Sequence, residues 1–358
     1  MSTEVDAPVD TLLELRSVTK TFPVREGVLR RVRGHVHAVS AASLTVLRGE
    51  TLGLVGESGS GKSTLGRLAL RLLDPTSGEV FFEGEPIAGG STRRMRRHAQ
   101  MVFQDPYSSF DPLMPVGASV AEPLDVHFSL SRSERTARLH ELVSLVAMTP
   151  EHLERYPREL SGGQLQRLAM ARALAVDPKL VVLDEPVSSL DVSTQAQVIN
   201  LLEKLQRELG VAYLFIAHNP ALVRHASDHI AVMYLGEIVE IGAAEDVYTA
   251  PKHPYTQALL SAVVVPDPEV QRSRRRIVLE GDVPNPTAPP PGCRFHTRCP
   301  YVMDICKTEV PPAFVTQSGT RVHCHLHTSG PMLAGAPVST LALSPGNGQR
   351  PEPPPISS

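Results

Sequence analysis

The chain has 358 residues, which fits two domains or one large domain with an extension. Its apolar share of 42% and charged share of 20% are ordinary for a globular protein, so a full hydrophobic core can form. A formal net charge of −3 gives no electrostatic reason to expect nucleic acid as the main partner.

Neither a secretion signal nor a membrane span is visible in the sequence. Residues 1–10 are acidic and lack the apolar stretch of a signal peptide. No apolar run approaches the roughly 20 residues that a helix needs to cross a bilayer. We therefore expect a soluble, cytoplasmic protein whose membrane role, if it has one, comes through partners.

Strands are expected first along the chain. Leu13, Leu15 and Val18 roughly alternate, and residues 39–47 are apolar enough to pair with that segment. Between them, residues 25–33 are basic and polar, which is typical of a solvated loop. Phe22 stands at the start of that loop. A lone Phe most often belongs to a core, and a role in nucleotide binding is the alternative.

A glycine-rich segment follows the apolar run 52–55 and precedes a helical pattern at 65–73. This segment, GESGSGKST at 56–64, has the form G-x-x-x-x-G-K-S of the Walker A phosphate-binding loop. Its backbone N–H groups and the positive end of the next helix point at phosphate oxygens. We expect Lys62 to reach the β- and γ-phosphates and Ser63 to bind Mg²⁺. An ordinary glycine turn is the alternative.

The next hundred residues first continue the α/β pattern and then depart from it. A turn at 74–78 leads into a hairpin, and 101–103 is a short buried strand that ends at Gln104. A Gln there is unremarkable alone, although its amide oxygen could ligate a metal. From Pro106 to about Pro157, prolines punctuate helical segments such as 133–147. This pattern predicts a helical subdomain inserted into an α/β core.

Ser161, Gly162 and Gly163 begin a helix whose apolar residues recur every three or four positions. Free N–H groups beside a Ser hydroxyl at a helix start predict a second anion site.

Two further strands place polar side chains at one sheet edge. The buried run 180–183 ends at Asp184 and Glu185, and the run 211–217 ends at His218. Ligands bind at this carboxyl edge in open α/β sheets. Paired acids at a turn are commonly surface residues, but here they favour a Mg²⁺ and water site.

Six motifs in this order resemble the nucleotide-binding domain of ABC transporters: GESGSGKST, Gln104, LSGGQLQR, LVVLDEP, SSLD and His218. The resemblance covers about residues 12–250. It implies an α/β fold, a P-loop NTPase of the ABC type with an inserted helical subdomain. Residues 251–262, 281–284 and 292–300 resemble the C-terminal extension of the dipeptide/oligopeptide importer ATPases. The chain looks most like the second of their two paired ATPase subunits.

The resemblance also implies roles for single residues. Phe22 would stack on adenine, Asp184 would hold Mg²⁺ with Ser63 and Gln104, and Glu185 and His218 would be catalytic. The implied ATP-binding set is Phe22, Gly56, Glu57, Ser58, Gly59, Ser60, Gly61, Lys62, Ser63, Thr64 and Gln104. The implied signature set, which completes the site of the opposite subunit, is Ser161, Gly162, Gly163 and Gln164. Asp191 would belong to the D-loop, and Asn219 replaces the Asp usual after the His.

All four cysteines lie in the last third of the chain, at Cys293, Cys299, Cys306 and Cys324. A reducing compartment disfavours disulfides, which leaves free thiols, zinc or an iron–sulfur cluster. Zinc sites more often show tight pairs, whereas four thiolates at open spacing suit a cubane. The resemblance implies a [4Fe–4S] cluster. Zinc stays open because His296, His323 and His325 could act as ligands.

We therefore expect three parts: an ABC ATPase domain at 1–250, with its helical subdomain at about 105–160, a Cys-bearing extension at 251–327 and a disordered Pro/Ser-rich tail at 328–358. The basic run 272–276 is expected to be a solvated linker.

The expected function is ATP hydrolysis that powers import of di- or oligopeptides at the cytoplasmic face of the cell membrane. The expected cofactors are ATP, Mg²⁺ and the cluster. The expected partners are a second ABC ATPase subunit in a heterodimer, two membrane permeases and, indirectly, a solute-binding protein, without nucleic acid. The alternatives are import of a metal chelate or another small solute, a soluble ABC ATPase outside transport, and a subunit without turnover.

Overall fold

A computed structural model describes residues 10–27, 31–87, 92–263, 277–329 and 333–341. The chain divides into two compact units, residues 1–238 and 239–358, and each is described by itself. The acidic start of the chain, the basic run 272–276 and the last part of the expected tail lie outside the described residues. Among the helices described, none combines the length and the apolar character needed to cross a membrane.

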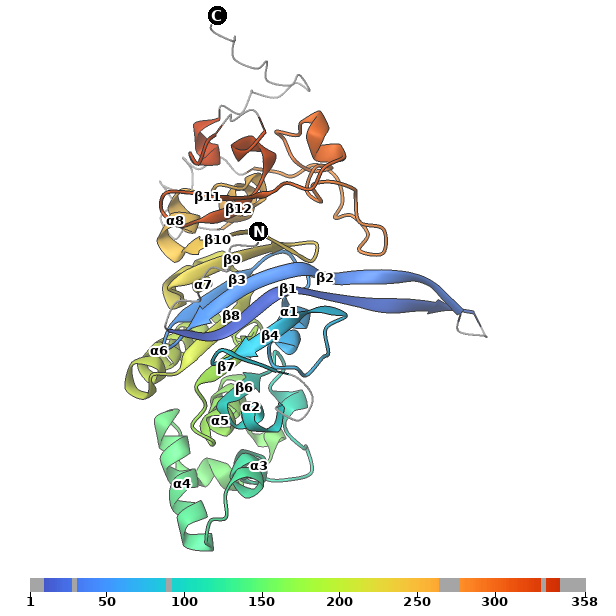
Figure 1. Cartoon of the computed structure of the whole chain (residues 1–358). Coiled ribbons are helices and arrows are strands. Elements are labelled where there is room, and N and C mark those ends of the chain that lie inside the picture. The colour runs from blue at the N-terminus through green and yellow to red at the C-terminus, as the bar shows by residue number, and fades with distance from the viewer. Residues whose placement is uncertain (1–9, 28–30, 88–91, 264–276, 330–332, 342–358) are drawn as a thin grey trace, which may run out of the picture. The chain divides into compact units, whose positions relative to one another are not determined.

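The first unit begins with an antiparallel sheet (Figure 1), in which β1 (Thr11–Glu26) and β2 (Arg31–Leu47) pair along their length. The sheet order is β2-β1-β4-β5, with β4 at Ser77–Phe82 and β5 at Glu85–Pro86. Leu13, Leu15 and Val18 are buried. The prediction of a loop over 25–33 is wrong for residues 25–26 and 31–33, which belong to β1 and β2, and residues 28–30 lie outside the described part of the chain. Polar, basic residues are compatible with a solvent-exposed ribbon as well as with a loop.

The core of the first unit is a parallel sheet in the order β9-β3-β8-β7-β6. Its strands are β3 (Thr51–Val55), β6 (Ala99–Val102), β7 (Leu180–Asp184), β8 (Ala212–Ala217) and β9 (His229–Tyr234). Every residue of β3, β7 and β8 is buried, as their unbroken apolar runs predict. The helices beside these strands are α1 (Lys62–Ala69), α2 (Thr92–His98), α5 (Gly162–Leu174), α6 (Val192–Leu209) and α7 (Pro220–Ala226). Parallel strands bring all their carboxyl ends to one edge of the sheet.

Between β6 and α5 the chain is helical. This stretch contains η2 (Tyr107–Ser109), α3 (Val116–His127), α4 (Arg132–Leu145), η3 (Pro150–Glu154) and η4 (Pro157–Glu159). Ser131 and Glu134 form a capping box that fixes the start of α4. α3 packs against both α4 and α5, so this helical layer is joined to the helix that begins at Ser161.

The second unit contains three paired strands in the order β10-β12-β11, and both pairs are antiparallel. Its elements are β10 (Glu237–Ala243), α8 (Ala244–Thr249), α9 (Pro254–Ser261), η5 (Asp304–Lys307), β11 (Ala313–Val315), β12 (Arg321–His323), η6 (His325–His327) and η7 (Val338–Thr340). Tyr301, Val322 and Cys324 belong to its apolar cluster, together with Leu333 and Val338. The prediction of a disordered tail from residue 328 onward is therefore wrong for residues 333–341, because Leu333 and Val338 in this segment pack into the apolar cluster.

Two buried ionisable residues, Glu240 and His253, fix the backbone that follows α8 through hydrogen bonds. The carboxylate of Glu240 is fully buried and accepts backbone N–H bonds from Lys252 at 2.7 Å and from His253 at 2.9 Å. Burial raises the pKa of Glu240 to about 7. His253 Nδ1 accepts from the N–H of Tyr255 at 3.0 Å, which caps α9. Burial lowers the pKa of His253 to about 3.

Candidate functional site

The glycine loop 56–61 joins β3 to α1 at the carboxyl edge of the parallel sheet. Gly61 has φ 105°, and a Cβ there would lie 2.1 Å from the carbonyl oxygen of Ala38. A Cβ at Gly56 would lie 2.1 Å from the carbonyl oxygen of Met233. Only glycine fits at these two close approaches, because any side chain would displace neighbouring backbone. The loop therefore curls tightly, as a phosphate cradle must.

Lys62 lies inside the curl of this loop. Its ammonium donates to the carbonyl oxygens of Gly56 and Glu57, at 2.9 Å each, and the residue is 4% exposed. Burial lowers the pKa of Lys62, and the nearby carboxylates of Glu185 and Asp184 act in the opposite direction. A buried cation held by two carbonyls is poised to exchange these contacts for phosphate oxygens.

Ser63 and Asp184 meet across the gap between α1 and β7. The Ser63 hydroxyl donates to Asp184 Oδ1 at 2.7 Å, and Asp184 is buried. Burial raises the pKa of Asp184, although the bond from Ser63 acts against this shift. A hydroxyl beside a buried carboxylate supplies the oxygen ligands that Mg²⁺ prefers.

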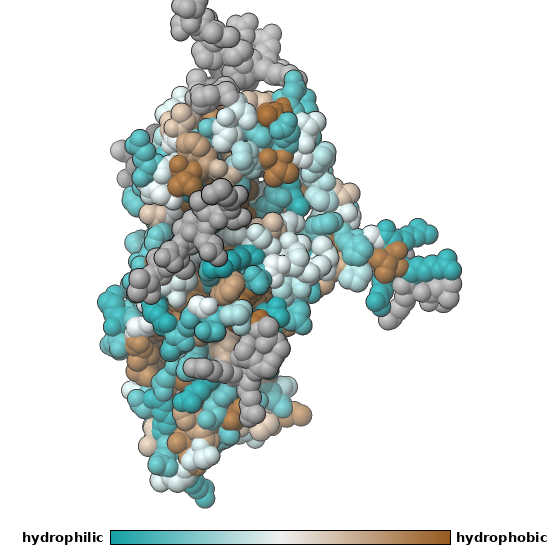
Figure 2. Space-filling view, viewed as in Figure 1, coloured by the Kyte–Doolittle hydropathy of each residue, from teal (hydrophilic) through white to brown (hydrophobic). Residues whose placement is uncertain are grey.

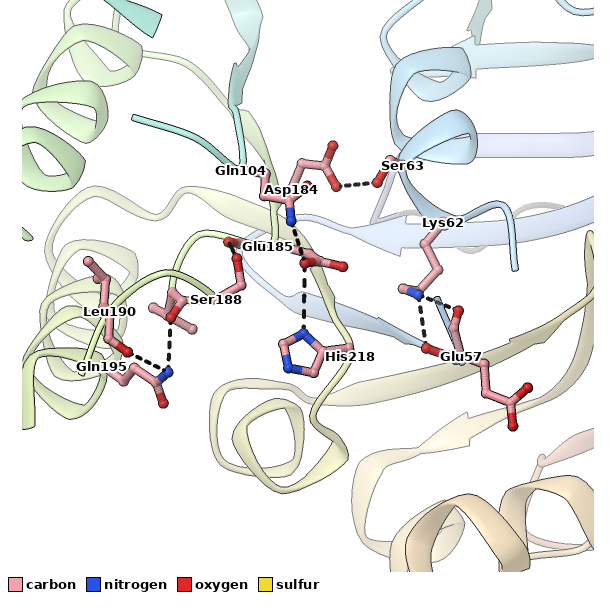
Figure 3. A network of polar contacts seen from close by, with 12 residues as sticks. Glu57, Lys62, Ser63, Gln104, Asp184, Glu185, Ser188, Leu190, Gln195 and His218 are labelled. Carbon is pink, nitrogen blue, oxygen red and sulfur yellow. Dashed lines mark hydrogen bonds and ion pairs between the residues drawn. The ribbon is translucent and has the colours of Figure 1, made fainter. Parts of the chain in front are cut away.

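Glu185 comes directly after β7 and lies beside two other residues of the predicted site (Figure 3). Its Oε2 accepts a bond from Gln104 Nε2 at 2.9 Å and lies 3.7 Å from His218 Nδ1. The longer distance is outside hydrogen-bond range. The His218 side chain is 58% exposed, so it has room to turn toward a ligand at this edge. The structure thus brings Lys62, Ser63 and Gln104 together with the three residues at the ends of β7 and β8.

The backbone of Glu185 has φ 48°, which is unusual for a residue other than glycine. Its N–H donates to Ile216 O at 2.9 Å, and the Ser188 hydroxyl donates to its carbonyl oxygen at 3.1 Å. Gln195 Nε2 then donates to the carbonyls of Val187 and Leu190, both at 3.0 Å. Sequence reasoning placed Ser188 in the SSLD motif without a role of its own, and it missed Gln195, since a Gln in a helix carries no recognisable pattern. Both position the turn that holds Glu185.

The predicted second anion site lies at the start of α5. Ser161 Oγ accepts from Gln164 N at 3.3 Å, and Gln164 Oε1 accepts from Ser161 N at 2.9 Å. This capping box satisfies two N–H groups and leaves those of Gly162 and Gly163 without a partner in the box.

Asp191 and Asn219 each cap a helix. Asp191 accepts bonds from the hydroxyls of Ser193 and Thr194, and these hold the pKa of its carboxyl well below the usual range. Asn219 Oδ1 accepts from Ala221 N at 3.0 Å at the start of α7. The sequence Asn-Pro, an N-cap residue followed by proline at the first helical position, is the signal that could have identified this cap.

Phe22 lies in β1 opposite Val36, two residues before Ala38. Its ring is half-buried, and Lys20 Nζ lies 5.3 Å from the ring centroid. The carbonyl oxygen of Ala38 in β2 lies against Gly61 of the phosphate loop. The β1–β2 strand pair, which includes Phe22, therefore runs past this loop.

The four cysteines belong to the second unit, and none of them forms a disulfide. Burial raises the pKa of Cys299 well above its usual value, with smaller contributions from Cys324, Cys293 and Cys306. Burial also raises the pKa of Cys324 to about 12. The four sulfurs are thus near enough to act on one another electrostatically. In the described parts of the chain, however, no set of three or more His, Cys, Asp or Glu side chains is arranged to hold a metal ion.

Comparisons with known proteins agree with this site. Residues 39–188 match the family described as "ABC transporter", and residues 239–306 match "Oligopeptide/dipeptide transporter, C-terminal region". The probable peptide ABC transporter ATP-binding protein y4tS of Sinorhizobium fredii is 49% identical over 94% of each chain. The oligopeptide transport ATP-binding protein AppF of Bacillus subtilis is 47% identical over 89% of this chain and 98% of its own.

Solved structures show the same fold over about two thirds of the chain. A dimeric structure of the ATP-binding cassette MJ0796 in a post-hydrolysis state, bound to ADP and Pi, has a TM-score of 0.58 at 29% identity. The match covers 65% of this chain and 99% of that one.

Proposed function

This chain belongs to the ATP-binding proteins of peptide ABC transporters, and from that premise we propose how its residues serve as the ATPase subunit of a peptide importer. The observation that carries the proposal is the cluster of Lys62, Asp184 and Glu185 beside a closed glycine loop. A buried cation, an oxygen-ligand pair and a carboxylate at one sheet edge are what phosphoryl transfer to water requires.

Binding uses the loop and the residues around it. The N–H groups of 56–61 and the Lys62 ammonium neutralise the triphosphate, and Phe22 stacks on the adenine. Ser63, Asp184 and Gln104 would hold the Mg²⁺, directly or through water, and the bound cation would supply positive charge that offsets the charge of the phosphates. The hydrogen bond from Ser63 to the buried Asp184 supports this assignment, because it keeps the two ligand oxygens close to each other.

Hydrolysis uses Glu185 and His218. Glu185 accepts a bond from Gln104 on one oxygen, which leaves the other free to orient and polarise the attacking water. His218, exposed at the same edge, contacts the γ-phosphate once ATP is bound. The strained backbone of Glu185 fixes where this carboxylate points, so catalysis rests on positioning and charge.

The signature 161–164 completes the site of a second ATPase subunit. The N–H groups of Gly162 and Gly163, which the capping box leaves aside, suit the γ-phosphate of an ATP held by the opposite subunit's Walker A loop. Two nucleotides are then shared between two subunits, here taken as a heterodimer, and Asp191 lies on the turn beside this junction. Closure of the pair drives two membrane permeases, and a solute-binding protein delivers the peptide to them.

The chain works at the cytoplasmic face of the membrane, as ATP-binding subunits of importers do. Peptides are the proposed cargo because the two relatives named above carry peptide or oligopeptide transport in their names. The matched C-terminal region points to the same cargo class. A metal chelate or another small solute is the alternative cargo.

We further propose that the four cysteines bind a [4Fe–4S] cluster. Four thiols in one small unit suit thiolate-ligated iron, and their mutual electrostatic influence supports a common site. A bound metal would offset the cost of deprotonating these buried sulfurs. An anaerobic preparation should be brown and absorb broadly near ~400 nm, as thiolate-ligated clusters generally do. Stoichiometric zinc without iron would contradict the proposal.

The function is tested by peptide uptake in a strain that lacks this chain. Wild-type protein should restore uptake, whereas Lys62→Ala should not, because the phosphates lose their buried cation. Uptake of a metal chelate instead of peptide would reassign the cargo. Full uptake with Lys62→Ala would overturn the proposed function.

A further inference from the structure

The turn that follows Gln104 is closed by its own side chains. The backbone N–H of Tyr107 donates to Asp105 Oδ1 at 2.9 Å. The hydroxyls of Ser108 and Ser109 donate to the carbonyl oxygen of Asp105, at 3.0 Å each. Asp and Ser side chains commonly stabilise turns by such local bonds. These bonds fix the backbone that carries the Tyr107 side chain.

The far end of this turn is attached to α5. Arg172 of α5 donates to the carbonyl oxygen of Ser109, and its guanidinium lies 5.2 Å from the centroid of the Phe110 ring. Phe110 is 4% exposed, so the cation–π contact is made against a buried ring. A hydrogen bond from a charged donor is stronger than one between neutral groups. The turn is therefore held to the same helix that begins with the signature.

The Tyr107 side chain contacts the backbone at the start of α5. Its hydroxyl donates to the carbonyl oxygen of Leu160 at 3.3 Å. The helix bonds of α5 begin with the carbonyl of Ser161, which accepts from Leu165 N, so the carbonyl of Leu160 lies outside the helix and can accept from a side chain. A Cβ at Gly162 would lie 4.0 Å from Tyr107 Cε2. The ring therefore stands beside the first glycine of the signature.

The signature glycines also lie close to the residues at the start of α6. A Cβ at Gly162 would lie 3.5 Å from Leu190 Cδ2, and one at Gly163 would lie 2.6 Å from Thr194 Cγ2. Protein interiors are close-packed, so a segment in such contacts cannot shift without displacing its neighbours. The direction of the N–H groups at the start of α5 is therefore set by the residues that surround it, and Tyr107 is one of them.

We propose that Tyr107 is a positioning residue for the ATP of the opposite subunit, because it fixes the start of α5 and so directs the N–H groups of Gly162 and Gly163. The inference rests on the proposed function, in which this signature completes the site of the second ATPase. Tyr107 stands three residues after Gln104, which belongs to this chain's own site, yet its side chain contacts the signature region. Its effect therefore falls on the opposite site.

The exposure of Tyr107 does not by itself indicate a docking surface. The residue is 50% exposed, but Figure 2 shows hydrophobic spots among mainly hydrophilic surface around α3 and α4 as well. Single exposed apolar residues are ordinary on protein surfaces. The specific feature of Tyr107 is the bond from its hydroxyl to Leu160, and this bond is what the experiment removes.

The test uses the complete importer, purified with its permeases and its paired ATPase. Photoaffinity labelling with 8-azido-ATP marks the subunit whose own phosphate loop holds the nucleotide, so each ATPase gives its own concentration for half-maximal labelling. Tyr107→Phe keeps the ring and removes only the hydroxyl. This variant should raise that concentration about 2- to 10-fold for the other ATPase subunit, the effect of one lost hydrogen bond, and leave labelling of this chain unchanged.

Tyr213→Phe is the matched control, because the Tyr213 hydroxyl also donates to a backbone carbonyl, that of Leu202, at 3.3 Å. Both labels should keep their wild-type concentrations in this variant. A merely structural role of Tyr107 would weaken both sites together. Equal weakening at both subunits, weakening at this chain alone, or no change with Tyr107→Phe would overturn the proposal, even if peptide uptake fell. Peptide uptake that persists with Lys62→Ala would instead contradict the proposed function itself.

Discussion

Replacing Glu185 by Gln should separate ATP binding from ATP hydrolysis. The amide has nearly the same shape, and its oxygen can still accept the bond that Gln104 donates at 2.9 Å. The backbone contacts of Glu185 with Ile216 and Ser188 do not involve the side chain, so the turn is kept. The variant loses only the negative charge and the second acceptor oxygen.

The size of the effect follows from what the site retains. The phosphates are bound by the glycine loop and Lys62, whose ammonium is bonded to Gly56 and Glu57 rather than to Glu185. Removing a nearby negative charge leaves ATP affinity unchanged or slightly higher. The kcat should fall ~10²- to 10⁴-fold, because the water loses its proton acceptor. This corresponds to about 3–5 kcal/mol in the barrier.

The assay is ATP hydrolysis and nucleotide binding by the purified importer. Glu79→Gln makes the same chemical change on an exposed residue of β4 and should be silent. A Glu185→Gln importer with wild-type kcat would refute the role of Glu185. Loss of activity through weaker ATP binding at constant kcat would refute the separation of binding from chemistry.

Three further outcomes are expected. Gly61→Ala should abolish nucleotide binding, because its Cβ would lie 2.1 Å from Ala38 O, whereas Gly84→Ala, with φ 78° and nothing within 4 Å, should retain it. Burial lowers the pKa of His253 from 6.5 to about 3. Between these two pH values the folded chain binds fewer protons than the unfolded chain, so its free energy of unfolding decreases as the pH falls from 6.5 to about 3. His253→Asn keeps a capping acceptor and should flatten this part of the urea-midpoint profile, and an unchanged slope would count against it. The isolated chain should hydrolyse ATP slowly and with a rate per molecule that drops on dilution, since each site needs two subunits, and a concentration-independent rate would argue for a complete site in one chain.

The local motifs were predictable because each is a short segment whose geometry is set by its own sequence. A strand, a glycine loop and a helix follow directly along 52–73, so Lys62 and Ser63 could be placed without tertiary information. Asp184 and His218 end apolar runs that can only be buried parallel strands. Their meeting at one edge follows from the topology of parallel sheets.

Other features depend on contacts between segments that the sequence does not mark. Residues 25–26 and 31–33 were predicted to lie in a loop but end β1 and begin β2, since basic residues are equally compatible with an exposed strand. Gln195 fixes the turn after Glu185 through two backbone carbonyls, and no residue pattern announces such a bond. Leu333 and Val338 pack into the cluster of the second unit although they stand among Pro, Ser and Gly.

The most direct test of the account is ATP-driven peptide uptake by the purified importer in proteoliposomes. With ATP and Mg²⁺ supplied on the side of the membrane where this subunit lies, labelled peptide should accumulate inside the vesicles in step with phosphate release. Both should vanish when Lys62→Ala replaces the wild-type chain. Peptide accumulation that persists with Lys62→Ala, or hydrolysis by the wild type that never moves a peptide, would contradict the claim that this chain powers peptide import.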